Sequence, residues 1–269
     1  MNATLSWQQF VAAMASMKGQ WVYRGMLPNA RLETSLERLC RAWGWPLTEA
    51  RDLERRLLRE FRRHPEARTA GAAADDLASL ALMQHHGAPT RLLDWTYSPF
   101  VAAFFAFDAL FQISLRERQR PKSAVVWAID LDWLNERIRL RLGSRLWDEY
   151  WDERKRPKSF SRVFLNHKPA ISFVGTATPI EMNERLSIQQ GVFLCPGDVS
   201  KSWEANLAAV AGRKTAAHIK RFHIKGSAMA EAFDGLTQMN LTARSLFPGL
   251  DGYAQWMAHR APLLKRLPT

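Results

Sequence analysis

Side chains suited to chemistry are concentrated between positions 84 and 96 of this sequence. His85, His86, Arg91 and Asp94 follow one another there within ten positions. Imidazole, guanidinium and carboxylate groups can transfer protons, bind anions and stabilise developing charge. Because an unpaired buried charge is costly, we expect an arginine and an aspartate so close to apolar segments to be paired. This stretch is therefore the first candidate for a functional site.

Two helices are predicted to hold this stretch in place. The first begins at the capping candidates Asp75 and Asp76 and ends at Gly87, the residue type that most easily adopts the left-handed helix terminus. The second begins with Ser98 as N-cap and Pro99 in the first turn, and its residues are apolar on almost every side. We expect it to be a buried central helix.

A second candidate is Arg24, within the short strand predicted for residues 21–25. Alternation along a strand places Val22 and Arg24 on one face and Tyr23 on the other. If Val22 faces the core, the Arg24 guanidinium lies near the interior, where a carboxylate or a phosphate is its natural bidentate partner. An ordinary salt bridge on an edge strand is the alternative interpretation.

The rest of the chain predicts an α+β fold with short, mainly antiparallel strands surrounded by helices. No repeat, low-complexity tract or change in composition divides residues 1–269, so we predict a single domain. The further strands are predicted at Ser123–Asp130, Ala170–Val174, Leu186–Leu194 and Thr215–Lys225. The further helices are predicted from about Thr4 or Ser6 to Gly19 and at Leu32–Trp43, Pro46–His64, Leu131–Leu142, Ala228–Asn240 and Leu250–His259, with loops at Pro65–Ala74, Arg116–Lys122 and Trp147–Phe160.

Composition favours a basic intracellular protein. The formal net charge is +12, which favours anionic partners such as nucleic acid or dinucleotides, although a solvated basic surface explains it equally well. Two cysteines in 269 residues fit a reducing compartment. The N-terminus has no signal-peptide pattern, and the apolar run Pro99–Phe111 is too short for a bilayer. We expect a soluble, cytoplasmic protein with no membrane partner.

Several common kinds of site have no motif in the sequence. His85 and His86 are adjacent and cannot share a helix face, and no His-x-x-x-His or Cys-x-x-Cys spacing is present, so we predict no metal site. The phosphate-binding loop and the nucleophile elbow are also absent. For the two histidines we favour a structural role for one and a polar active-site role for the other.

Four motifs together resemble one known family, the FRG domain. They span residues 21–253 and comprise Tyr23-Arg24-Gly25, the stretch 84–99 with the apolar helix that follows it, Gln190-Gly191-Val192-Phe193, and Leu246-Phe247-Pro248-Gly249-Leu250-Asp251-Gly252. Each motif is weak by itself, but the combination is specific. The order of the motifs is also similar to that of ADP-ribosyltransferase-like folds, which have a split sheet.

This resemblance implies NAD as substrate and assigns roles to particular residues. A first-strand arginine that holds NAD corresponds to Arg24. The second motif, a hydroxyl residue before an alanine-rich helix, corresponds to Thr96. The third motif, which brings the catalytic acid, falls within 184–190, where Glu184 is our candidate, Asp94 is its rival and Gln190 stands at the expected place. The expected catalytic residues are Arg24, Glu184 and Gln190, and the expected NAD-binding residues are Tyr23, Gly25, His86, Arg91, Asp94, Trp95 and Thr96.

The chemistry behind these roles can be stated independently. Cleavage of the nicotinamide glycosidic bond passes through an oxocarbenium-like state that a carboxylate stabilises. Arg24 and Arg91 suit a pyrophosphate, and Trp95 suits stacking on a nicotinamide or adenine ring. If Gln190 replaces the acid, the protein binds a nucleotide without turning it over.

Three hypotheses about function therefore remain open. The first is an ADP-ribosyltransferase-type enzyme that modifies a macromolecule, protein or nucleic acid, or cleaves NAD, in phage defence or as a toxin. The second is a noncatalytic basic module that binds nucleic acid or nucleotide, suggested by the +12 charge. The third is a domain that only binds a partner protein, because the sequence shows no evident nucleophile.

Overall fold

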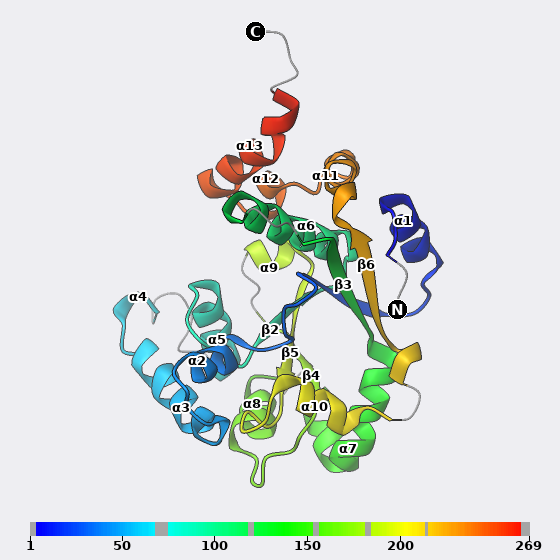
Figure 1. Ribbon diagram of the computed structural model, residues 1–269. Coiled ribbons are helices and arrows are strands. Elements are labelled where there is room, and N and C mark those ends of the chain that lie inside the picture. Colours follow the sequence, from blue (N-terminus) through cyan, green and yellow to red (C-terminus); the bar gives the residue numbers. More distant parts are fainter. Residues whose placement is uncertain are drawn as a thin grey trace.

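Six strands form one open sheet in the computed structural model, which describes residues 4–67, 75–117, 121–152, 156–180, 184–212 and 215–264 (Figure 1). The strand order is β4-β5-β2-β1-β3-β6, and all neighbouring strands run antiparallel. The strands are β1 (Trp21–Met26), β2 (Leu93–Thr96), β3 (Ser123–Asp130), β4 (Val174–Ala177), β5 (Gly191–Pro196) and β6 (Ile219–Lys225). The predicted α+β class with antiparallel strands is confirmed.

The two central strands of the sheet, β1 and β2, have fewer paired residues than any other neighbouring strands of the sheet. Strands β1 and β2 are in register at one residue pair, Tyr23 with Thr96, whereas β1 and β3 pair along six residues from Trp21–Asp130 to Met26–Val125. The sheet therefore consists of two well-paired halves, β4-β5-β2 and β1-β3-β6, that diverge beside a single contact. The resemblance implied a split sheet; the strands belong to one sheet, with this narrow junction at its middle.

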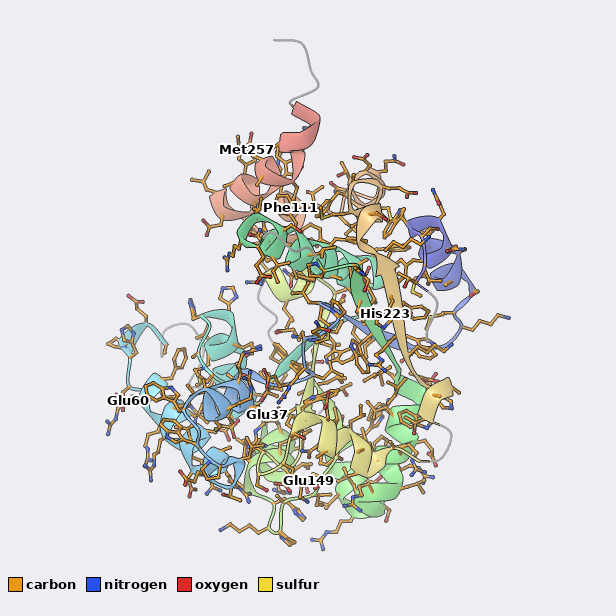
Figure 2. All side chains as sticks on the ribbon, in the orientation of Figure 1. Glu37, Glu60, Phe111, Glu149, His223 and Met257 are labelled. Carbon is orange, nitrogen blue, oxygen red and sulfur yellow. The ribbon has the colours of Figure 1, made fainter. Side chains whose placement is uncertain are left out.

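Helices surround the sheet in three groups, as Figure 1 shows. Helices α6, α11, α12 and α13 lie at one end, α7, α8 and α10 at the other, and α2, α3, α4 and α5 to one side, whereas α1 lies beside β6 and α9 precedes β5. Their bounds are α1 (Trp7–Ser16), α2 (Ser35–Ala42), α3 (Ala50–Phe61), α4 (Pro65–Ala67), α5 (Asp76–His85), α6 (Pro99–Arg116), α7 (Leu131–Trp151), α8 (Arg156–Phe160), α9 (Glu184–Ile188), α10 (Trp203–Val210), α11 (Met229–Gln238), α12 (Ala243–Leu246) and α13 (Leu250–Leu264). Side chains fill the space between these helices and the sheet (Figure 2).

Strand β1 separates two buried cores. Val22 and Met26 belong to the core shared with β2, β5 and α7, whereas Trp21 and Tyr23 belong to the core shared with α1, α6 and α11. This alternation follows from the two-residue period of a strand. Arg24 therefore shares the face of the buried Val22, as predicted.

Helix α6 is the buried central helix that the sequence predicts. The Ser98 side chain accepts a hydrogen bond from the Val101 N–H, and Pro99 occupies the first turn. A β-carbon on Gly25 of β1 would lie 1.8 Å from the Ala102 carbonyl oxygen of α6, so only glycine permits this close approach. By length and composition alone the 18 residues of α6 could cross a membrane, a test that a buried core helix also passes; here α6 packs between the sheet and α11.

The structure corrects several predicted boundaries. The strand predicted at Leu186–Leu194 is the end of helix α9, a turn and then β5, and the strand predicted at Ala170–Val174 begins only at Val174. Helix α7 continues beyond Leu142 to Trp151, through a residue with non-helical backbone angles at Gly143. The loops predicted at 65–74 and 116–122 lie partly outside the described residues, and Pro65–Ala67 is a helical turn.

Candidate functional site

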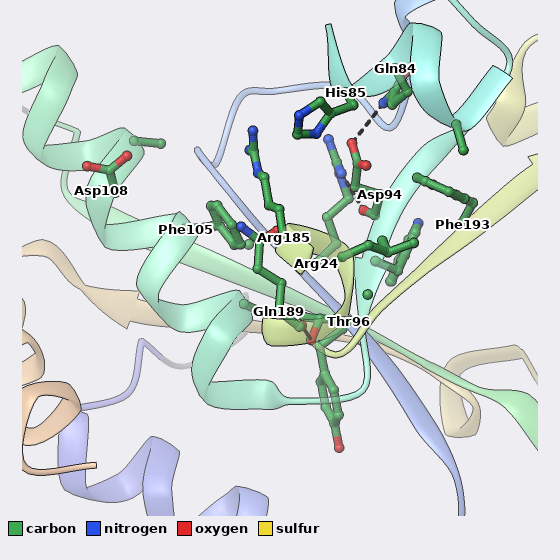
Figure 3. Close-up of a pocket in the computed structure, with 18 residues that line it drawn as sticks. Arg24, Gln84, His85, Asp94, Thr96, Phe105, Asp108, Arg185, Gln189 and Phe193 are labelled. Atoms are coloured by element: carbon green, nitrogen blue, oxygen red, sulfur yellow. Dashed lines mark hydrogen bonds between the residues drawn. The ribbon is translucent and has the colours of Figure 1, made fainter. Parts of the chain in front are cut away.

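A pocket of about 360 Å³ opens where the two halves of the sheet diverge. Residues of β1, β2 and β5 form its base, and α5, α6 and α9 supply its walls. Figure 3 shows its polar side chains gathered around one space: Arg24, Gln84, His85, Asp94, Asp108, Arg185 and Gln189. The pocket thus brings together residues that are up to 170 positions apart, from Tyr23 to Phe193.

Arg24 lies on the pocket side of β1 and is held against β2. Its Nη1 atom donates a hydrogen bond to the main-chain oxygen of Asp94. Burial lowers the pKa of Arg24, the Asp94 charge opposes that shift, and the charge of Arg38 adds to it. Arginine remains protonated nonetheless, because its ordinary pKa is so high. Arg24 thus bonds the main-chain oxygen of Asp94, and not the carboxylate or phosphate that was expected as its bidentate partner.

The Asp94 carboxylate is positioned by a short hydrogen-bond chain. Gln84 Nε2 donates to Asp94 Oδ2 at 2.9 Å, and the Thr90 hydroxyl donates to Gln84 Oε1 at 2.6 Å. Because Thr90 fixes the carbonyl end of the amide, the amide nitrogen must face the carboxylate. One oxygen of an exposed carboxylate is thereby held, and the other, Oδ1, is directed to no hydrogen-bond donor among the described residues. Gln84 belongs to a motif recognised in the sequence but was given no role there.

Of the two adjacent histidines, the structure places His85 in the pocket. His86 follows the helix as its C-cap and is exposed, and Gly87 adopts φ +78° just after it, as predicted for the helix terminus. Burial, then the charges of His86 and Arg185, lower the pKa of His85, so its ring is neutral at physiological pH. His86, the histidine expected at the site, does not line this pocket, whereas His85 does.

The hydroxyl of Thr96 closes the base of the pocket. Its Oγ1 donates to the Gln189 main-chain oxygen at 2.7 Å and accepts from the Ser98 N–H at 3.0 Å. These bonds connect the end of β2 both to the turn before β5 and to the start of α6. Tyr23 and Gly25 also line the pocket, and burial raises the pKa of Tyr23 to about 12.

Trp95 lines the same pocket but is not free to stack on a ligand ring. It is 3% exposed, and its ring stacks on Trp203 at a centroid distance of 5.9 Å and an interplanar angle of 19°. The aromatic face that the sequence offered to a nicotinamide or adenine ring is therefore used by the core.

Arg91 does not line the pocket, in contrast to its expected role. Its guanidinium is 1% exposed and forms a bidentate ion pair with Glu54, which is fully buried, while Nη1 donates to the Phe164 oxygen at 2.7 Å. Burial alone would lower the pKa of Arg91, but the charge and hydrogen bonds of Glu54 outweigh it and raise that pKa. Arg91 is paired, as expected for a buried charge, but its partner is Glu54 rather than Asp94 or Glu184.

The third predicted motif lies on a helix and a turn. Glu184 begins α9, is exposed, and lines a neighbouring pocket of about 520 Å³ that also contains His85 and Arg185. Gln190 is exposed in the turn before β5 with φ +47°, and its main-chain oxygen accepts from the Tyr97 N–H. Of the expected catalytic residues, Arg24 lines the first pocket, Glu184 the adjoining one and Gln190 neither.

Two charged residues of the pocket were not predicted. Asp108 reaches it from α6 and accepts a hydrogen bond from His259 Nε2 of α13 at 2.9 Å. Arg185 reaches it from α9, and its guanidinium lies 4.7 Å from the ring centre of Phe247. In the sequence, Asp108 only interrupts the apolar run Pro99–Phe111. Its position one helix turn after Phe104 and Phe105 was the available signal that it belongs to the pocket.

The described residues include no group of three or more histidine, cysteine, aspartate or glutamate side chains that could hold a metal ion. The chemistry of the pocket is instead that of two arginines, two carboxylates and a neutral histidine. The protein is thus an α+β protein with an open antiparallel sheet, and the pocket at the central junction of the sheet is its candidate ligand site.

A comparison with protein families finds a match over part of the chain. Residues 19–113 match the model of the FRG domain, the family that the motifs resemble. The matched segment includes β1, β2 and most of α6, and therefore Arg24, Asp94 and Asp108. No curated protein and no solved structure matches the chain. The motifs at 190–193 and 246–252 lie beyond the matched segment.

Proposed function

We propose that the pocket binds NAD and that the chain transfers or releases its ADP-ribose moiety, as an ADP-ribosyltransferase-type enzyme. One observation carries the proposal: Arg24, Asp94 and Arg185 face one another in a single pocket (Figure 3). A dinucleotide needs cationic donors for its phosphates and a carboxylate near the ribose whose bond breaks. The pocket supplies both within a volume typical of small-molecule sites.

The arrangement of the strands supports this proposal. The three motifs of the ADP-ribosyltransferase resemblance are a strand with arginine, a strand with a hydroxyl residue followed by an apolar helix, and a third strand. Here these are β1 with Arg24, β2 with Thr96 followed by α6, and β5, and they are neighbours in the order β5-β2-β1. This likeness is an analogy of arrangement, and the residues must carry the chemistry.

Asp94 is the acid that we assign to bond cleavage. It lies in the pocket with Arg24, and its carboxylate is oriented by Gln84, whereas Glu184 lines the adjoining pocket. As the glycosidic bond to nicotinamide breaks, positive charge develops on the ribose, and a fixed carboxylate stabilises it. The bond electrons leave with nicotinamide, which departs neutral. Water or a nucleophile of the acceptor then bonds to the anomeric carbon and gives up a proton, for which His85, which lines the same pocket, is our candidate base.

The test is nicotinamide release from NAD by the purified protein, with and without cell lysate as a source of acceptor. We expect release to fall at least about a hundredfold in Asp94→Asn, because a preorganised electrostatic partner is lost. Arg24→Gln is expected to weaken NAD binding, and Glu184→Gln to affect only transfer that needs the lysate. Glu136→Gln, which removes an exposed carboxylate of α7, serves as the matched control.

Absence of release under every condition, together with no rise in melting temperature on addition of NAD, would refute the proposal. A noncatalytic nucleotide- or nucleic-acid-binding module is then favoured by two observations. The net charge is +12, and glutamines, at 189 and 190, precede β5 where the acid was expected. Nucleic-acid binding would be recognised by a steep loss of affinity with salt, shared over many lysines and arginines.

A further inference from the structure

Two hydrogen-bond donors of the pocket have no acceptor. Among the described residues, three buried side-chain polar atoms lack a hydrogen-bond partner: Arg24 Nε, Trp95 Nε1 and Asn135 Oδ1. The first two belong to residues that line the pocket at the sheet junction, and both are N–H donors. Folded proteins satisfy nearly all buried polar groups, because an unpaired one lowers stability. Two such donors in one pocket point to an external acceptor.

The indole of Trp95 is held rigidly in place. Its ring is 3% exposed and stacked on Trp203, so the Nε1–H cannot swing toward an acceptor elsewhere. An indole N–H donates one hydrogen bond and accepts none. Trp203, by contrast, directs its own Nε1 to the Leu194 main-chain oxygen at 3.4 Å. The two stacked tryptophans therefore differ in that only Trp95 keeps an unused donor.

The guanidinium of Arg24 is also fixed in orientation. Its Nη1 is bound to the main-chain oxygen of Asp94, the residue next to Trp95, which leaves Nε as a donor without a partner. Of the charges that act on Arg24, the negative charge of Asp94 affects its pKa more than the positive charge of Arg38, and Arg185 also lines the pocket. The unmatched pocket atoms are thus donors only.

We propose that Trp95 Nε1–H and Arg24 Nε–H together bind one oxyanion group of the ligand, a phosphate of the dinucleotide. Such a group offers acceptor oxygens and no donor, which matches what the pocket lacks. The role of Trp95 is then to donate a hydrogen bond from its edge, in place of stacking its face on a base. This inference rests on the proposed function only in taking the pocket as the nucleotide site; it does not require that NAD be cleaved.

The test is Trp95→Phe, which keeps an aromatic ring against Trp203 and removes the N–H. Isothermal titration calorimetry is performed with ADP-ribose and inorganic pyrophosphate, which carry the anion, and with nicotinamide riboside, which carries no phosphate. We expect the Kd for ADP-ribose and pyrophosphate to rise roughly ten- to a hundredfold, the usual effect of losing a hydrogen bond to a charged group. The Kd for nicotinamide riboside should stay unchanged.

Trp203→Phe is the matched control, because it removes an indole N–H from the same stack without touching the pocket. It should leave the Kd for ADP-ribose unchanged. A direct measurement on the wild-type protein covers the case in which Trp95→Phe does not fold: the indole ¹H–¹⁵N resonance of Trp95 should move downfield when pyrophosphate is added. A resonance that stays in place at saturating pyrophosphate would overturn the proposal.

The remaining outcomes separate this proposal from the enzymatic one. Tight binding of ADP-ribose that depends on Trp95, in a protein that releases no nicotinamide, would support the oxyanion site and refute catalysis. Release of nicotinamide with an unchanged Kd for ADP-ribose in Trp95→Phe would refute the oxyanion site and keep catalysis. Failure of both ADP-ribose and pyrophosphate to bind the wild-type protein would also overturn it, since solvent would then be the only acceptor.

Discussion

The buried ion pair between Arg91 and Glu54 allows a quantitative prediction of how much stability the protein loses when either side chain is replaced. Arg91 Nε lies 2.8 and 2.9 Å from the two Glu54 oxygens, and the side chains are 1% and 0% exposed. Replacing either residue alone leaves an uncompensated charge in the core, which destabilises a protein by about 3–5 kcal/mol. For a chain of this size we expect Glu54→Leu and Arg91→Met each to lower the melting temperature by on the order of 10 °C.

The double variant that combines Glu54→Leu and Arg91→Met should recover most of the stability that each single variant loses. With both charges gone, apolar side chains of similar length fill the space, and such replacements are often neutral. The remaining penalty is the Phe164 carbonyl, which loses the donor Nη1 of Arg91 and, as an unpaired buried acceptor, costs about 1–3 kcal/mol. We therefore expect the double variant to be clearly more stable than either single variant in urea unfolding, with a coupling energy of at least about 3 kcal/mol.

Ligand binding gives the second readout of the same variants. Because Arg91 does not line the pocket, Arg91→Met that is still folded at low temperature should bind ADP-ribose as the wild type does. Additive effects in the double-mutant cycle would refute the ion-pair argument. Normal stability with lost ADP-ribose binding would restore Arg91 to the ligand site where the sequence hypothesis placed it.

Three further predictions follow from single residues. Gly25→Ala should destabilise the protein by at least about 1–3 kcal/mol in urea unfolding, because its new methyl group would meet the Ala102 carbonyl oxygen at 1.8 Å; wild-type stability would contradict the close packing of β1 on α6. The pKa of Tyr23 is about 12 in the folded protein and 10.0 in the unfolded chain, so its stabilising effect is complete below pH 10 and is lost as the pH rises toward 12. Tyr23→Phe should therefore move the midpoint of alkaline unfolding, followed by circular dichroism, to higher pH. An unchanged midpoint would count against the burial of Tyr23. Cys40 and Cys195 are buried with raised pKa values, so neither should react with a thiol reagent at pH 8 until the protein is unfolded, and rapid native labelling would contradict that packing.

Local patterns in the sequence were sufficient for much of the fold. The strand Ser123–Asp130 was predicted to the residue, since its β-branched and aromatic side chains pack on both faces of the sheet. The entry to α6 was also predicted, because a serine cap followed by proline has few other uses. The failure at Leu186–Leu194 has an equally local cause: apolar residues at 186 and 188 fit a strand, yet a turn at Gln190 separates a short helix from β5.

The candidate site could be predicted only in part, because its partners come together through tertiary packing. Sequence analysis placed Arg24 and Asp94 in one site, and both line the pocket. It did not find Arg185, which reaches the pocket only because α9 folds back before β5. It also chose His86 over His85, a decision that depends on the exact end of α5 and so on one residue of helical phase.

Arg24 and Arg91 show how hydrogen-bond satisfaction separates two arginines that the sequence treats alike. The Arg91 guanidinium has an acceptor at each of its nitrogens, all from the protein, and adding a ligand there would displace contacts that already exist. The Arg24 guanidinium is fixed at Nη1 and left with an unused Nε, and the indole donor of Trp95, which lines the same pocket, is also unused. A donor that the fold both immobilises and leaves unpaired lowers stability unless something else binds it. Two such donors in one pocket therefore support our proposal of a bound oxyanion, in which the edge of Trp95, rather than its face, meets the ligand.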